Sequence, residues 1–311
     1  MKPRFCAFCE SPQFISSPTL QPGTQLIQCS RCGAAFTDPQ PSPTDLERQY
    51  SETYYGPENV KFLHSFEKLV GLITRWRAQR INELLAPHSR IFEIGCGRGL
   101  LLASLAHRGH ECHGTERSEL AARRARKNVG LKIYTSPLEQ CSLEPNYFDL
   151  VILWHVLEHM EQPGHCLSYI SRVLKPGGLL LVEVPNYSSL QSRLAGKYWF
   201  HLDINRHLYH FSKEGLKELL DKSDFELTKQ STFSWDQCPY GALQSLLNLL
   251  GLPPELLYRL LKREIQLPWH EKAFQFLLAA ALVVPLTGFS IIESLMGKGG
   301  VIRAIARNQR K

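Results

Sequence analysis

Short apolar runs alternate with helical patterns between about residues 90 and 231, and this alternation predicts the fold. Strands are expected at six runs, over residues 91–94, 111–115, 132–135, 148–153, 179–184 and 225–231. Most are separated by segments whose apolar residues recur at helical spacing. Such alternation is typical of a parallel sheet covered by helices on both faces, which binds its ligand beyond the carboxyl ends of the strands. The pattern predicts a doubly wound α/β domain.

Further elements are expected on both sides of this core. A capping box of Thr44 and Glu47 predicts a short helix over residues 44–55, and apolar residues at helical spacing predict a second over 60–86. Residues 301–307 read as the last strand, inserted antiparallel beside the strand at 225–231. The chain would thus hold a linker with helices at 41–86 and a core at 87–235 plus 298–311.

An apolar segment interrupts the core before its last strand. Residues 273–292 carry no formal charge and could span a bilayer by length, but Pro285 and Gly288 interrupt them. A single crossing would also place the last strand on the wrong side of the membrane. Residues 236–297 are therefore expected to form a helical apolar insertion. It would pack as a lid or dimer surface, or make peripheral membrane contact through 273–292, and the sequence leaves these alternatives open.

Two matched cysteine pairs near the N-terminus predict a structural metal site. Two residues separate Cys6 from Cys9 and Cys29 from Cys32, and 19 residues separate the pairs. Four thiolates spaced in this way close a tetrahedral shell around Zn²⁺. The alternative is chance spacing of ordinary buried cysteines, which is how we interpret the remaining five. We expect a zinc-ribbon-like module over residues 1–40, followed by a proline-rich linker.

Composition and charge narrow the function classes only in part. Apolar residues make up 43% and charged residues 21% of the 311 residues, which excludes a disordered or collagen-like chain. The net charge of +7 suits anionic ligands, nucleic acid or acidic lipid without choosing among them. The first residues lack the apolar core of a secretory signal, so we expect a cytoplasmic protein with reduced cysteines.

A glycine-rich turn follows the first strand of the predicted sheet, with glycines at 95, 97 and 99. A dinucleotide fingerprint needs glycine at position 100, where Leu100 stands, and this weakens an NAD-binding interpretation. Glu93 ends the strand with a carboxylate that a phosphate would not favour. Glu116 ends the second strand, where a carboxylate can bind both hydroxyls of a ribose. These residues predict a nucleoside ligand with positive charge and no pyrophosphate.

The segment 93–99 resembles motif I of the class I S-adenosylmethionine-dependent methyltransferases, with glutamate in place of the commoner aspartate. Segments 148–151, 154–159 and 172–179 resemble later motifs of that family in the same order. The resemblance covers about residues 90–231 and implies a Rossmann-like seven-stranded sheet with S-adenosylmethionine as cofactor. Where many members carry an aspartate ahead of the adenine contacts, this chain reads Ser136-Pro137-Leu138-Glu139. The cofactor contacts implied by the resemblance are Glu93, Gly95, Gly97, Gly99, Glu116, Leu138 and Trp154.

Histidines are the expected bases, because an acceptor of a methyl group must lose a proton. His155 and His159 follow the fourth strand, spaced as on one helical turn. His207 lies in a segment that resembles the histidine-containing loop over the acceptor site of sugar C-methyltransferases with N-terminal zinc modules. We expect His207, and after it His155, to be catalytic. Metal binding by these histidines, or hydrogen bonds that orient loops, are the alternatives.

The predicted function is methyl transfer to a small-molecule acceptor such as a sugar, a glycan precursor or a lipid-linked intermediate. An RNA methyltransferase is the first alternative, suggested by the zinc ribbon and the net charge. The basic residues form no long stripe, however, and no platform for stacking single-stranded bases is evident, which disfavours nucleic acid. The second alternative is a binding module with a vestigial cofactor site.

Overall fold

The computed structural model describes residues 5–16, 20–42, 44 and 62–310 of the chain. Two compact units make up the chain. The first holds residues 1–46, 184–219 and 230–303, and the second holds residues 47–183, 220–229 and 304–311. The helix expected over 44–55 falls almost entirely outside the described residues. The finer division into four segments stays a prediction.

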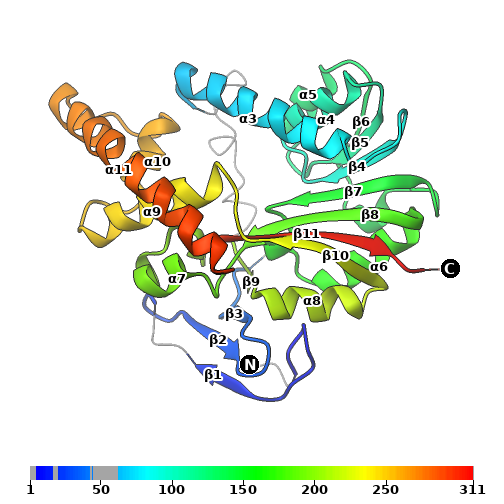
Figure 1. Cartoon of the computed structure of the whole chain (residues 1–311), viewed down its shortest axis with the longest axis horizontal. Helices are drawn as coiled ribbons and strands as arrows, with labels where there is room; N and C mark the ends of the chain where they lie inside the picture. Colours follow the sequence, from blue (N-terminus) through cyan, green and yellow to red (C-terminus); the bar gives the residue numbers. More distant parts are fainter. Residues whose placement is uncertain (1–4, 17–19, 43, 45–61, 311) are drawn as a thin grey trace. The chain divides into compact units, whose positions relative to one another are not determined.

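The second unit is built mainly on a seven-stranded sheet with the order β10-β11-β8-β7-β4-β5-β6 (Figure 1). Neighbouring strands from β8 to β6 pair in parallel, with Ile91 opposite both Cys112 and Leu150. Five of the six strands expected within 90–231 lie within one residue of their predicted bounds, and β8 begins earlier. The doubly wound α/β fold is therefore confirmed. The strands are β4 (Arg90–Ile94), β5 (Glu111–Thr115), β6 (Leu131–Tyr134), β7 (Phe148–Trp154), β8 (Leu174–Pro185), β10 (Phe225–Ser231) and β11 (Val301–Asn308).

The last strand is inserted into the sheet beside β10, as predicted. β11 lies between β10 and β8, and its arrow in Figure 1 runs against those of β7 and β8. The hydroxyl of Thr228 on β10 donates to the carbonyl oxygen of Ile305 on β11 at 2.9 Å. The chain after the apolar insertion thus returns to the sheet one strand in from its edge.

Helices on the sheet supply its core. In α5, Ser118 caps the first turn, and Ala121, Ala122 and Ala125 are buried. Ile152 of β7 and Leu102 of α4 join the same apolar cluster, and burial of such a large side chain stabilises the fold by about 1.5–3 kcal/mol. The helices are α3 (His64–Asn82), α4 (Leu100–Ala106), α5 (Glu119–Arg126) and α6 (Pro163–Val173), with 3₁₀ turns η2 (Leu138–Gln140) and η3 (Leu157–His159). Helix α8 (Lys213–Asp221) belongs largely to the first unit.

Helix α3 is shorter than the predicted span of 60–86. It ends at Asn82, and Pro87 disfavours a helical conformation in the residue before it. Residues 60 and 61 lie outside the described part of the chain.

The first unit holds a small antiparallel sheet with the order β1-β2-β3-β9. β9 pairs through Tyr209 and His210 with Phe36 and Ala35 of β3, so a segment far along the chain completes the sheet of the cysteine module. The elements are β1 (Phe14–Ser16), β2 (Gln25–Cys29), β3 (Ala35–Asp38), β9 (Tyr209–His210), α7 (Leu190–Ala195), η4 (Gly196–Tyr198), η5 (Phe200–Leu202), α9 (Gln237–Leu249), α10 (Leu256–Leu261) and α11 (Trp269–Leu295).

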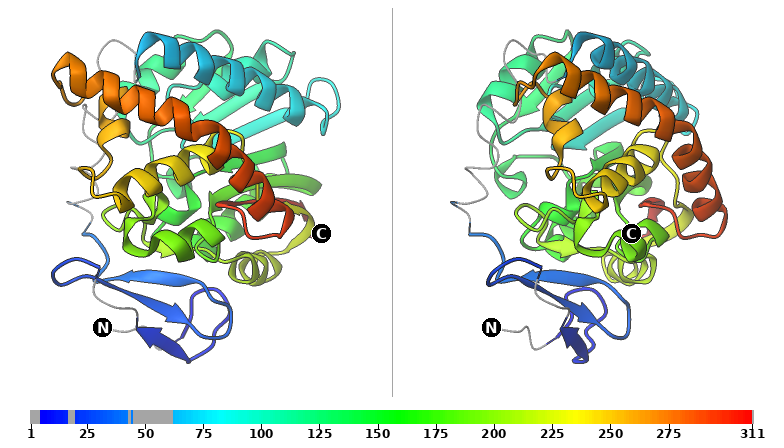
Figure 2. Two further views of the ribbon diagram at one scale, coloured as in Figure 1. Left: turned by 60° about the vertical axis from the view of Figure 1, so that its left-hand side comes forward. Right: turned by 90° about the vertical axis from the view of Figure 1, so that its left-hand side faces the viewer.

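The predicted apolar insertion is helical. It comprises α9, α10 and the 27-residue helix α11, which packs along α9 (Figure 2). By length and composition α11 is able to cross a membrane, and only 11% of its most apolar window is buried.

Candidate cofactor site and cysteine cluster

The glycine-rich turn joins β4 to α4 in a conformation that favours glycine. Gly95 and Gly97 have positive φ angles of 68° and 54°. A Cβ atom at Gly95 would stand 2.7 Å from Cγ2 of Val156, whereas one at Gly97 would meet no atom of the described residues within 4 Å. The backbone of Gly97 therefore borders open space, as a loop that cradles a ligand requires.

Glu93, near the end of β4, is a buried carboxyl that lacks a partner on one oxygen. The residue is 6% exposed, and its Oε2 atom has no hydrogen-bond partner among the described residues. The pKa of this carboxyl is raised to about 8. Burial is the main cause, the charge of Glu116 adds to it, and the charge of Arg77 opposes it. A buried polar atom without a partner calls for a ligand group that donates a hydrogen bond or carries positive charge. The ammonium of a methionine moiety has this chemistry.

Glu116, directly after β5, fixes the glycine-rich turn. Its Oε2 accepts a hydrogen bond from the backbone N–H of Gly97 at 2.9 Å, and its Oε1 accepts one from the N–H of Ser118 at 2.8 Å. A carboxylate oxygen can accept more than one hydrogen bond, so these contacts are compatible with binding of a ribose. The sequence predicted the ribose contact but not the structural one.

The remaining predicted cofactor contacts lie at the same edge of the sheet. Leu138 opens η2 soon after β6 and is buried, and Trp154 ends β7. Because β4, β5, β6 and β7 are parallel, their carboxyl ends meet at one edge, where such folds bind ligands. The structure therefore gathers the predicted residues, and their contacts with the cofactor stay a prediction.

Two residues near this site were missed by the sequence reasoning, and both come from α3. The guanidinium of Arg77 lies 3.8 Å from the ring centroid of Trp154, and its charge acts on Glu93. Glu67 forms a two-pronged ion pair with Arg98 of the glycine-rich turn, at 3.2 and 3.1 Å. Neither residue stands out in the sequence, because α3 carries several other charged residues.

His155 lies between two carboxylates. Its Nδ1 is 3.3 Å from Oε1 of Glu158, and its Nε2 is 3.2 Å from Oε1 of Glu183. Burial lowers its pKa, but the two glutamates raise it more, to about 10. The ring is then a cation at neutral pH and a poor proton acceptor. The predicted helical turn is also wrong: His155 has a positive φ of 54° and precedes the 3₁₀ turn that ends at His159.

His207 belongs to the first unit and has a defined tautomer. Its buried ring directs Nδ1 at the carbonyl oxygen of His201, 3.0 Å away, and a carbonyl only accepts hydrogen bonds. In the neutral ring the proton therefore resides on Nδ1. The carbonyl oxygen of His207 also accepts from the hydroxyl of Thr37, which ties this segment to β3.

The four cysteines of the predicted module converge. Their sulfur atoms all lie within 4.8 Å of one another, with Cys6 and Cys32 at 3.8 Å and Cys9 and Cys29 at 3.5 Å. Zn–S bonds of about 2.3 Å place the sulfurs of a tetrahedral site about 3.8 Å apart. The donor set thus fits Zn²⁺. The other five cysteines are buried, as predicted.

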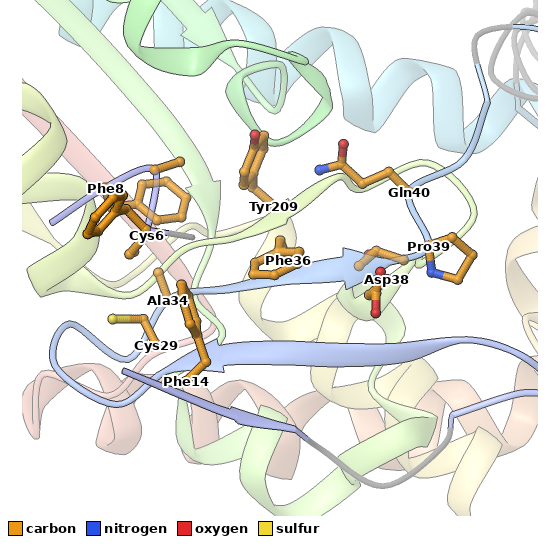
Figure 3. Close-up of a pocket in the computed structure, with 13 residues that line it drawn as sticks. Cys6, Phe8, Phe14, Cys29, Ala34, Phe36, Asp38, Pro39, Gln40 and Tyr209 are labelled. Carbon is orange, nitrogen blue, oxygen red and sulfur yellow. The ribbon is translucent and has the colours of Figure 1, made fainter. Parts of the chain in front are cut away.

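A pocket of about 310 Å³ opens beside this cluster within the first unit (Figure 3). Two polar residues, Asp38 and Gln40, are among its lining, and the carboxylate of Asp38 accepts a hydrogen bond from the Gln25 amide at 3.2 Å. Aromatic faces with a few polar groups are typical of small-molecule sites. The aromatic rings that line the pocket belong to Phe5, Phe8, Phe14, Phe36 and Tyr209.

Comparison with known proteins supports the interpretation of the sheet. A family model described as a methyltransferase domain matches residues 67–230, more than half of the chain. A ubiquinone biosynthesis O-methyltransferase of Azoarcus sp. is 32% identical over 103 residues, and one of Caulobacter sp. is 35% identical over 103 residues. Each match covers 31% of this chain, and it spans only 44% and 41% of the two relatives.

A solved structure shows the same fold. The S-adenosylmethionine-dependent methyltransferase of Archaeoglobus fulgidus superposes with a TM-score of 0.50 at 21% identity. The superposition covers 76% of this chain and 94% of that one.

Proposed function

This chain belongs to the methyltransferase-domain family and is an S-adenosylmethionine-dependent enzyme, and we propose that it methylates a small molecule. The assignment of the cofactor site rests on the buried Oε2 of Glu93, which has no hydrogen-bond partner among the described residues, beside the open glycine-rich turn. When bound, S-adenosylmethionine supplies an electrophilic methyl group. Glu93 would accept a hydrogen bond from the ammonium group of the cofactor. The Gly97 backbone would border the methionine part, and Glu116 would bind the ribose.

We assign the role of base to His207. Transfer from a sulfonium is an in-line displacement, so the chain has to orient the acceptor and take up its proton. The Nδ1 contact with the His201 carbonyl orients the ring of His207 for this role. His155, held between Glu158 and Glu183, is a cation, and we assign it a positioning role at the end of β7.

The acceptor we propose is an uncharged ring that carries hydroxyl groups, such as a sugar or a phenol. The pocket beside the cysteines supports this class, because aromatic faces stack on rings and Asp38 accepts hydrogen bonds from hydroxyls. The same carboxylate disfavours a phosphate. The relatives named O-methyltransferases support an oxygen as the methylated atom.

A transfer assay tests the proposal. Labelled S-adenosylmethionine is incubated with the protein and with sugars, phenols, lipid-linked sugars and transfer RNA in parallel. Transfer to a member of the first three groups is expected, with a raised KM in Asp38→Asn and an unchanged cofactor Kd. Transfer to RNA alone would overturn the small-molecule assignment. Cofactor binding without transfer to any acceptor would favour a binding module.

We also propose that the four cysteines hold one structural Zn²⁺. The four-thiolate donor set leaves no position open for a substrate, and of the residues of β1, β2 and β3 only Leu26 and Ala35 are buried members of the neighbouring apolar cluster. The ion would then supply much of the folding free energy of the module. Its removal should unfold residues 1–40 while the cofactor site of the second unit still binds its ligand.

A further inference from the structure

Helix α11 exposes its apolar side chains and buries its polar ones. Leu277 and Val284 are 71% and 74% exposed. Gln275, Ser290 and Glu293, by contrast, are buried on the opposite side. A surface helix of a water-soluble protein has the reverse arrangement. The exposed side of α11 therefore calls for an apolar environment outside the first unit.

Contacts at the C-terminal end of α11 and along its side disfavour a spanning orientation. Glu293, in its last turn, accepts hydrogen bonds from the side chain and backbone N–H of Gln191 on α7. Just beyond the helix, the carbonyl oxygen of Gly299 accepts from the Asn186 amide at 2.8 Å, and the chain continues into β11. The C-terminal end of α11 is thus fixed to the first unit. Because α11 also packs along α9, an orientation parallel to a surface keeps all of these contacts.

The width of the apolar face distinguishes lipid from a second copy of the chain. At about 100° per residue, Phe274 and Val283 lie about 180° apart around the helix, with Leu277 and Val284 between them. The seam of two paired helices covers a narrower stripe of roughly 100° or less, and it would leave side chains such as Val283 in water. A lipid surface covers the whole exposed half.

A lysine at each end of the apolar face can contact an anionic surface. Lys272, which stands next to the exposed Glu271, and Lys298 flank the face, and Glu293, the one ionisable side chain between the two lysines, is buried. Trp269, at the start of the helix, is 81% exposed, and tryptophan is enriched where membrane and water meet. We propose that α11 lies flat in the surface of an anionic membrane, with its apolar half among the acyl chains.

Flotation with vesicles tests this proposal in the full-length protein. Phosphatidylcholine vesicles with and without phosphatidylserine are compared for the wild type and for Leu277→Glu/Val284→Glu. The matched control is Val129→Glu/Leu194→Glu, which adds the same charge at positions that are 91% and 64% exposed outside α11. Calorimetry of S-adenosylmethionine binding and thermal melting verify that each variant is folded.

The wild type and the control are expected to float with phosphatidylserine vesicles, less so as salt rises. The α11 variant should bind these vesicles at least about tenfold more weakly. Each apolar side chain that no longer enters the acyl chains lowers the affinity by roughly tenfold or more. Three results overturn the proposal. In the first, the wild type stays in solution with both kinds of vesicle. In the second, the α11 variant floats as well as the control. In the third, light scattering shows a wild-type dimer that the α11 glutamates split, and no vesicle binding is found.

Discussion

Affinity for S-adenosylmethionine should rise with pH between 6 and 8, because Glu93 has to lose its proton before it accepts an ammonium group. Burial raises the pKa of this carboxyl to about 8. The cationic ligand favours the ionised form, so binding below this pKa is coupled to release of one proton. Each pH unit below it costs about 1.4 kcal/mol of binding free energy, a factor of ten. Because half of the carboxyl is ionised at a pH equal to its pKa, the affinity should increase by about 50-fold between pH 6 and pH 8.

Replacement of Glu93 by glutamine removes both the titrating group and the charge. Glu93→Gln should bind more weakly at pH 8 and lose most of the pH dependence, whereas Glu119→Gln, on the exposed start of α5, should behave as wild type. Isothermal titration calorimetry in two buffers of different ionisation enthalpy measures affinity and proton release together. A wild-type affinity that is flat from pH 6 to 8, or a glutamine variant that retains the wild-type slope, would refute this reasoning.

The remaining predictions concern the glycine-rich turn, the carboxylate of Glu116, the zinc site and the proposed base His207. Gly97→Val should abolish cofactor binding in calorimetry, because its side chain occupies the open space at a φ of 54°, whereas NADH binding tighter than S-adenosylmethionine would contradict the cofactor class. Glu116→Ala should weaken binding by about 1–3 kcal/mol or more, since it loses the ribose contact and frees the turn, and an unchanged Kd would argue against both roles. Elemental analysis should find one zinc per chain, and Cys29→Ser should lower both zinc content and melting temperature; reduced protein without zinc and a Cys29→Ser variant as stable as wild type would disprove the site. His207→Ala should reduce kcat by about 10²–10⁴ with the cofactor Kd unchanged, and full activity would exclude it as the base.

Local patterns allowed most of the second unit to be predicted. Parallel strands buried on both faces read as short apolar runs, so their positions follow from the sequence within about a residue. The glycine-rich turn and Glu93 are likewise adjacent in the chain. Arg77 and Glu67 were missed because their contacts depend on how α3 packs against α4, a long-range relation that no spacing in the sequence encodes.

The same distinction applies to the first unit. The four cysteines were predicted because ligand spacing is a local property, and the structure brings them together. The pairing of Phe36 with Tyr209 was not predicted, because it joins segments more than 170 residues apart. The charged state of His155 also escaped prediction. One of its two carboxylate partners, Glu183, comes from the next strand of the sheet.

Helix α11 shows why an apolar segment alone could not distinguish a lid from a membrane anchor. Its sequence is apolar almost all round, so periodicity does not identify the side that packs on the protein. The structure places the few polar residues, Gln275, Ser290 and Glu293, on the buried side, where Glu293 is bound by Gln191. A helix that uses its polar residues for packing has no reason to leave its apolar half in water. If the acceptor is carried by a lipid, as one of the predicted acceptor classes is, docking through α11 would hold the enzyme at the surface where that acceptor resides.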